Sequence, residues 1–235
     1  MNNCYKYNSI EELVGHLINK KGFVFRGCTN KEYKLSPGAY RECLSEDFNF
    51  NFEYIENEHE ALLKLIRMYV DYKKHFEVYY FGQHHGFKTK LLDFTWNPII
   101  ALIFACAEWN PLNEEKNRNT DGILYVVNPE RFNKILEKQF EDLGQLIVDC
   151  DESTIGHNDV YQKTIQFINP PKELSKRISN QESCFFLFPK ICENIFEIKP
   201  EQCEEIIIIP TLEKENILSY IKNNYNLSMD NLREL

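Results

Sequence analysis

The spacing of apolar residues near the start of the chain is that of a helix. Within residues 10–18 the apolar positions follow the pattern i, i+3, i+4, i+7 and i+8, which lies on one face of an α-helix. Ser9 stands directly before this run, and Glu12 lies three residues after Ser9. This is the pattern of a capping box. Lys20, Lys21 and Gly22 favour a helix end. We therefore expect a helix between Ser9 and Gly22.

Similar patterns predict further helices. Residues 52–80 are amphipathic over a long stretch, with a break expected near 73–75. Asn97-Pro98 is a strong helix start, because Asn caps the free N–H groups and Pro fits the first turn. The helix that follows, through residues 99–109, is apolar nearly all round and is expected to be buried. Asn128-Pro129 predicts another helix start, and residues 212–224 and 228–235 predict terminal helices.

Short apolar runs between these helices predict strands. The runs cover residues 23–27, with Arg26 at the strand exit, and residues 91–95, 121–127, 146–150, 184–189 and 205–210. Four consecutive isoleucines, at residues 206–209, favour a buried central strand. Pro170-Pro171 is the clearest internal breaker, but no long linker accompanies it. The expectation is one α+β domain over residues 1–235, a mixed sheet with flanking helices.

Composition and charge narrow the class of protein. Of the 235 residues 43% are hydrophobic, enough for one sizeable core, and the 17 Phe and 13 Tyr favour a core built on rings. The net charge of -9 argues against a general nucleic-acid or anionic-membrane partner. Residues 1–45 nevertheless carry seven Lys or Arg against four Glu. A locally positive pocket is therefore compatible with an acidic protein.

The eight cysteines form no Cys-x-x-Cys pair, and several lie in apolar runs. Free thiols in a reducing compartment are expected, and we predict that all eight are unpaired. The first residues lack a basic segment followed by an apolar stretch, and no run approaches the roughly 20 apolar residues of a membrane span. A cytoplasmic location without membrane contact is the expectation.

Arg26 follows an aromatic run and could present its planar fork of donors to a phosphate or carboxylate; the alternative is a surface or salt-bridged arginine. Asp93 precedes the buried helix and is either a site residue or a brace for its loop. His84 and His85 are adjacent, which makes them a poor metal pair, so no metal site is expected. Gln181 alone would suit a solvated loop.

Four motifs together carry a family resemblance. They are Phe25-Arg26-Gly27, the unbroken run from Gln83 to Ala105 (QHHGFKTKLLDFTWNPIIALIFA), Asp121-Gly122 and the Arg-Ile-x-x-Gln element of residues 177–181. In this order they resemble the FRG domain, named for Phe-Arg-Gly, and the likeness is strongest over residues 23–190. The long central motif makes the resemblance specific.

The layout also resembles the ADP-ribosyltransferase fold, which implies a mainly antiparallel, split sheet and NAD as cofactor. Arg26 would then hold the phosphates, Thr95 and Asp93 would come from a second strand, and Gln181 from a third. The implied catalytic residues are Asp93, Gln181 and His84. The implied ligand-binding residues are Arg26, Gly27, Gln83, His85, Thr89, Thr95 and Asn97. The implied partners are a nucleotide-type small molecule and a protein acceptor, and the implied role is a toxin or phage-defence effector.

One departure leaves the activity open. No glutamate stands at the Gln181 position, and the adjacent Glu182 would face the other way in a strand. Either the pocket only binds its ligand, as a sensing or interaction module, or Asp93 supplies the missing negative charge. Metal-assisted hydrolysis by His84, His85 and Asp93 is the weakest alternative, because the spacing is wrong.

Overall fold

A computed structural model gives the fold. It describes residues 4–41, 80, 82–83, 87–108, 117, 119–135, 164–170, 175–189 and 195–233. The predicted helix of residues 52–80 (apart from Tyr80), the predicted strand of residues 146–150, and both His84 and His85 lie outside these residues.

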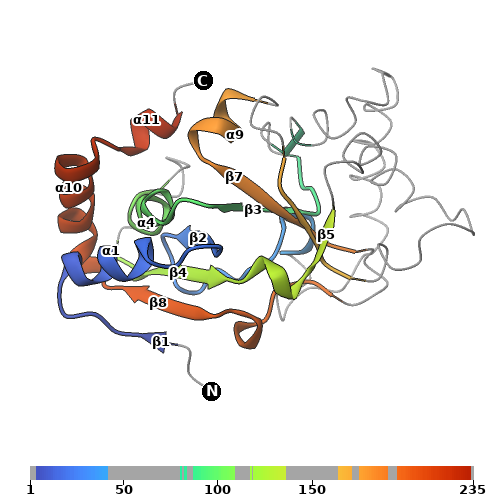
Figure 1. The fold of residues 1–235 in the computed structure, drawn as a ribbon, viewed down its shortest axis with the longest axis horizontal. Coiled ribbons are helices and arrows are strands. Elements are labelled where there is room, and N and C mark those ends of the chain that lie inside the picture. Colours follow the sequence, from blue (N-terminus) through green and yellow to red (C-terminus); the bar gives the residue numbers. More distant parts are fainter. Residues whose placement is uncertain are drawn as a thin grey trace, which may run out of the picture.

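The described strands form one eight-stranded sheet with the order β1-β8-β4-β2-β3-β7-β6-β5 (Figure 1). Five of its seven neighbouring pairs are antiparallel, and the pairs at its two ends, β1–β8 and β5–β6, are parallel. The predicted α+β class with a mixed, mainly antiparallel sheet is therefore confirmed.

The strands are β1 (Cys4–Tyr5), β2 (Val24–Cys28), β3 (Leu91–Thr95), β4 (Gly122–Val127), β5 (Asn133–Ile135), β6 (Gln166–Ile168), β7 (Ser183–Leu187) and β8 (Glu205–Ile209). The α-helices are α1 (Ile10–Ile18), α4 (Pro98–Cys106), α9 (Lys176–Asn180), α10 (Lys214–Tyr225) and α11 (Met229–Arg233). Short 3₁₀ turns are η1 (Gly38–Tyr40), η5 (Pro129–Arg131), η8 (Pro200–Gln202) and η9 (Thr211–Glu213).

Both predicted caps begin helices. The Ser9 hydroxyl accepts from the backbone N–H of Glu12 at 3.2 Å at the start of α1. The Glu12 carboxylate accepts from the backbone N–H of Asn8 at 3.1 Å, one residue further out than a capping box requires. At α4 the Asn97 side chain accepts from Ile99 N–H at 2.9 Å. Because these signals are local, the sequence located both starts correctly.

Two predicted elements differ from the structure. Asn128-Pro129 opens only the 3₁₀ turn η5, because the chain enters β5 two residues after it. The strand of four isoleucines, β8, is one strand from the sheet edge and not central, since only β1 lies beyond it. Ile207 and Ile209 are fully buried, but Ile206 and Ile208 are only partly so. One face of β8 is therefore less well covered than its composition suggested.

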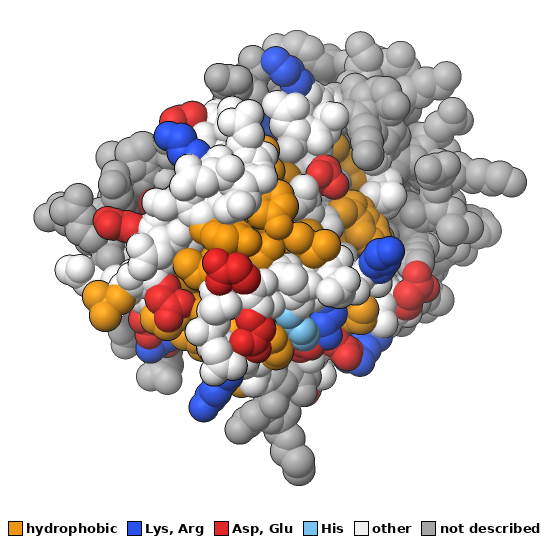
Figure 2. All heavy atoms as spheres, turned by 60° about the vertical axis from the view of Figure 1, so that its left-hand side comes forward, with side chains coloured by type: hydrophobic (Ala, Val, Ile, Leu, Met, Phe, Trp, Pro, Cys, Tyr) orange, Lys and Arg blue, Asp and Glu red, His pale blue; other side chains and the backbone are white. Residues whose placement is uncertain are grey.

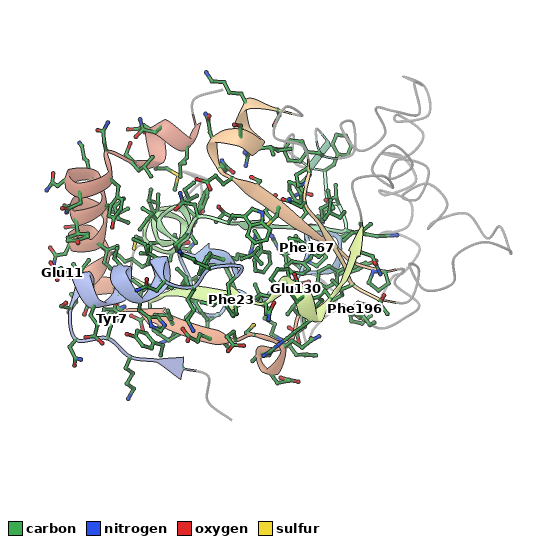
Figure 3. The ribbon with its side chains drawn as sticks, viewed as in Figure 1. Tyr7, Glu11, Phe23, Glu130, Phe167 and Phe196 are labelled. Carbon is green, nitrogen blue, oxygen red and sulfur yellow. The ribbon has the colours of Figure 1, made fainter. Side chains whose placement is uncertain are left out.

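The central strands β2 and β4 separate two apolar cores. Helices α1, α4 and α10 bury one face, where they meet Phe25, Leu124 and Ile207. The other face is rich in rings and is covered largely by loops, with Tyr40 and Phe186 fully buried there. Figure 3 shows Phe167 and Phe196, which belong to the ring-rich side, far from Tyr7, which packs against the helical side. The prediction of a core built on aromatic rings therefore holds for one of the two cores, and the other is mainly aliphatic.

Two glycines allow α4 to lie directly against the sheet. A Cβ on Gly27 of β2 would lie 1.8 Å from the carbonyl oxygen of Ala101. A Cβ on Gly122 of β4 would lie 2.2 Å from the carbonyl oxygen of Ala105. Both distances are shorter than any real contact, so a side chain at either position would push the helix away from the strands.

On the side of the molecule that carries α10, apolar side chains reach the surface, with both acidic and basic side chains around them (Figure 2). Among the described residues, no helix combines the length and apolar character that a membrane crossing needs.

The five described cysteines, at positions 4, 28, 106, 184 and 203, are free thiols. Burial raises the pKa of Cys106 and of Cys203 to about 12, and it also raises that of Cys184. Because the thiolate is the reactive form, we expect iodoacetamide to label the exposed Cys4 first in the native protein. Cys106, Cys184 and Cys203 should react only after denaturation, as followed by peptide mass spectrometry. Fewer than eight reactive thiols in denaturant without reductant would show a disulfide and contradict the sequence prediction.

Candidate functional site

The sheet is split between β2 and β3. These strands share a single residue pair, Phe25 with Thr95. In contrast, β2 pairs with β4 over five residues, and β3 pairs with β7 over five residues. Beyond the Phe25–Thr95 pair the two halves of the sheet separate, and a cavity of about 750 Å³ opens at the split. Its volume lies within the range of small-molecule sites, roughly 300–1,000 Å³.

Arg26 spans this split. Its Nη1 donates a hydrogen bond to the backbone carbonyl of Asp93 at 2.5 Å and lies 3.9 Å from the Asp93 carboxylate. The side chain is only 17% exposed, and its Nε is buried without a hydrogen-bond partner among the described residues. Arg26 is the third residue of β2 and not at the strand exit, because pairing with β4 continues to Cys28. The alternative of a surface arginine does not fit this burial, whereas that of a salt-bridged arginine agrees with the ion pair to Asp93.

Gly27 also lines the cavity. Glycine is needed here because α4 approaches β2 closely. The sequence alone did not show this reason. The last residues of α4 and those just after it, Phe104, Ala107 and Glu108, form part of the cavity wall. The position of α4 against Gly27 therefore helps to shape the cavity.

A chain of polar side chains holds Asp93. Gln83 Nε2 donates to Asp93 Oδ1 at 2.8 Å, and the Thr89 hydroxyl donates to Gln83 Oε1. Asp93 lines the cavity, whereas Gln83 and Thr89 are not among the described residues that do so. Of these two predicted ligand-binding residues, Gln83 orients the Asp93 carboxylate directly and Thr89 holds Gln83 in place. The Asp93 side chain stays 50% exposed.

Thr95 and Gln181 meet at one end of the cavity, and both line it. The Thr95 hydroxyl donates to the backbone carbonyl of Gln181 at 2.6 Å, and the Gln181 amide donates to the carbonyl of Leu232 at 3.2 Å. Gln181 is buried, so the solvated-loop alternative is wrong. It does not lie on a strand either, since it caps the end of α9 and β7 begins at Ser183.

Asn97 and Glu182 form a structural pair next to this end. The Asn97 amide donates to the Glu182 carboxylate at 2.8 Å while its oxygen caps α4. Glu182 has a left-handed backbone with φ 46°, which a turn and not a strand imposes. The Asn97 side chain, predicted to bind ligand, therefore forms hydrogen bonds that connect the start of α4 to the turn before β7.

The cavity brings in further residues that were not predicted as site residues. They include Tyr33, Arg41, Glu108 and Arg177. Arg177 begins the Arg-Ile-x-x-Gln element noted above, so a signal existed for it. Tyr33 and Glu108 carry no such signal, because only the folded chain brings their segments to the split.

Charged side chains of both signs line the cavity. The described basic residues are Arg26, Lys34, Arg41 and Arg177, and the acidic ones are Glu32, Asp93 and Glu108. The three arginines come from separate segments of the chain. Desolvation by the surrounding protein and the positive charge of Arg26 both lower the pKa of Arg41. Like charges placed together in this way favour an anionic ligand. Within the described part of the chain, no three His, Cys, Asp or Glu side chains are grouped so that they could hold a metal ion.

The arrangement is that of an α+β protein with a cavity where its sheet is split. The family model of the FRG domain matches residues 21–114, which include β2, β3 and α4. The chain therefore carries an FRG domain over these residues. No curated protein and no solved structure matches the chain. The resemblance to ADP-ribosyltransferases finds no support in these comparisons.

Proposed function

We propose that the cavity at the split binds a nucleotide-type anion, with NAD as the first candidate, and that Arg26 is its phosphate-binding residue. The observation that carries this proposal is the Arg26 guanidinium, which reaches the cavity with a buried Nε that has no partner among the described residues. A buried donor without a partner is costly, and a ligand oxygen would satisfy it. Arginine is also the side chain best suited to grip a phosphate with paired donors.

The chemistry proposed for this site is transfer of ADP-ribose, in a toxin or phage-defence effector. Asp93 is the acid closest to Arg26 that the cavity offers, and Gln83 fixes the direction of its carboxylate. A carboxylate in this place can stabilise positive charge that develops on a ribose, or accept a proton from an acceptor group. The amide of Gln181 is bonded to Leu232, so we assign the electrostatic role to Asp93.

The second candidate is a sensing or interaction module that binds the same ligand without turnover. Gln181 in place of an acid, with its amide hydrogen-bonded to the backbone of α11, favours this alternative. Consumption of NAD, followed by mass spectrometry of acceptor proteins, separates the two. Saturable binding with NAD left intact would select the sensing module.

The Arg26→Lys variant tests the binding proposal. Lysine keeps the charge but removes the planar fork, so we expect the affinity for NAD and ADP-ribose to fall by about 10- to 100-fold, as for one charge-assisted hydrogen bond. Calorimetric titration, with ligand-induced thermal shift as a second readout, measures this.

The matched control is Arg131→Lys, since Arg131 is an exposed arginine paired with Glu204 on the surface. It should bind as the wild type does. If neither NAD nor ADP-ribose shifts the wild-type melting temperature at millimolar concentration, the nucleotide proposal is wrong.

A further inference from the structure

The segment that leads to Arg41 is anchored to three other parts of the chain. The Ser36 hydroxyl donates to the carbonyl of Phe196 at 2.6 Å, and the buried Tyr40 hydroxyl donates to that of Pro189 at 2.6 Å. The backbone N–H of Ala39 donates to the carbonyl of Thr89 at 3.0 Å, just before β3. Arg41 therefore follows a turn, η1, that is fixed to the residues flanking β3 and β7 and to the loop that carries Phe196.

The side chain of Arg41 is oriented as well. Its Nε donates to the carbonyl of Ser36 at 3.3 Å, and its Nη groups have no hydrogen-bond partner in the described part of the chain. Arg41 lines the same cavity as Arg26, and the positive charge of Arg26 lowers the pKa of Arg41. Asp93, which also faces the two arginines, already accepts a hydrogen bond from Gln83. The cavity wall also carries Glu32, which is exposed, and Glu108, which accepts hydrogen bonds from Thr29 and Asn117. The donors of the two oriented guanidinium groups therefore exceed what Asp93 satisfies.

We propose that Arg41 is a second phosphate-binding residue and that the ligand of this cavity carries a diphosphate and not a single phosphate. The inference rests on the proposed nucleotide function and narrows it. A single phosphate group could contact both arginines, but two linked phosphates present more acceptor oxygens and more negative charge to the two guanidinium groups. A diphosphate therefore satisfies more of their donors than a monophosphate does. Arg41 thereby determines specificity between nucleoside monophosphates and diphosphates.

The test compares four probes, namely inorganic phosphate, inorganic pyrophosphate, AMP and ADP, by calorimetric titration. The wild type should bind ADP at least about tenfold more tightly than AMP, and pyrophosphate more tightly than phosphate, because one further charge-assisted contact forms. Arg41→Gln should lower the affinity for ADP by about tenfold or more and that for AMP by less than about threefold. The ADP-to-AMP ratio should therefore collapse.

Two further proteins make the result decisive. Arg41→Lys keeps the charge and should retain part of the ADP preference, whereas the surface variant Arg131→Gln should leave all four affinities unchanged. Circular dichroism and melting temperature establish that each variant is folded. Equal binding of AMP and ADP to the wild type, or an equal loss of both in Arg41→Gln, would overturn the diphosphate assignment while leaving nucleotide binding intact. If none of the probes binds the wild type, both proposals fail.

Discussion

The Gly27→Ala variant should be destabilised by roughly 3 kcal/mol or more, at the upper end of the cost of overpacking. The added methyl group would lie 1.8 Å from the carbonyl oxygen of Ala101 and 2.6 Å from the backbone nitrogen of Ala105. Both are backbone atoms of α4, so no side-chain rotation can relieve the contact. Helix and strand must move apart, and the cores on which they pack must loosen. Urea denaturation followed by circular dichroism measures the change in the free energy of unfolding.

Gly15→Ala is the matched control. Gly15 is an exposed residue inside α1, and a Cβ there meets nothing within 4 Å. Alanine should therefore stabilise the helix by about 0.5–1 kcal/mol, because glycine loses more backbone freedom on folding. Equal denaturation midpoints for the two variants would show that α4 does not rest on Gly27 as described.

Phe186→Ala should cost about 3–5 kcal/mol, the usual range when a buried ring is removed from a core. Phe186 is completely buried in β7, and its ring lies 4.8 Å from those of Phe94 and Phe132 and 5.3 Å from that of Phe167. Neighbouring strands on both sides hold these rings, so the cavity left by alanine can close only in part. Thermal and urea unfolding both measure the loss.

Phe87→Ala provides the comparison, since Phe87 is 43% exposed. Its removal should change the free energy of unfolding by less than about 1 kcal/mol. Phe186 does not line the cavity as described, so the folded fraction of Phe186→Ala should bind ligand normally at low temperature. A change of less than about 1 kcal/mol in Phe186→Ala itself would refute the account of the ring-rich core.

The sequence predicted the elements whose signals are local. The strand of residues 91–95 and the start of α4 were both correct, because an apolar run and an Asn-Pro cap act within a few residues. The place of β8 in the sheet was wrong, because four isoleucines favour a strand but say nothing about how many strands lie beyond it. Asn128-Pro129 begins only a 3₁₀ turn, because the chain soon enters β5 and the Asn-Pro motif does not indicate how far a helix continues.

The candidate site was predicted in part for the same physical reason. Arg26, Asp93 and Gln181 do line one cavity, and the order of motifs had indicated a common site. Their roles in binding and catalysis stay predictions. The backbone setting of Gln181 was wrong because a left-handed residue, Glu182, turns the chain just before β7. Tyr33 entered the cavity unpredicted, since its place depends on contacts between distant segments.

The single pair between β2 and β3 has a consequence for dissecting the protein. The matched segment, residues 21–114, contains these two strands but neither β4 nor β7, with which they make their long ladders. A fragment cut to the family match would carry β2 and β3 with one shared pair and without their long-ladder partners, and such open strand edges favour aggregation. Any recombinant fragment meant to keep the cavity should therefore extend through β8, whose residues pair with β4. The boundaries of the family match and those of a stable fragment are thus expected to differ.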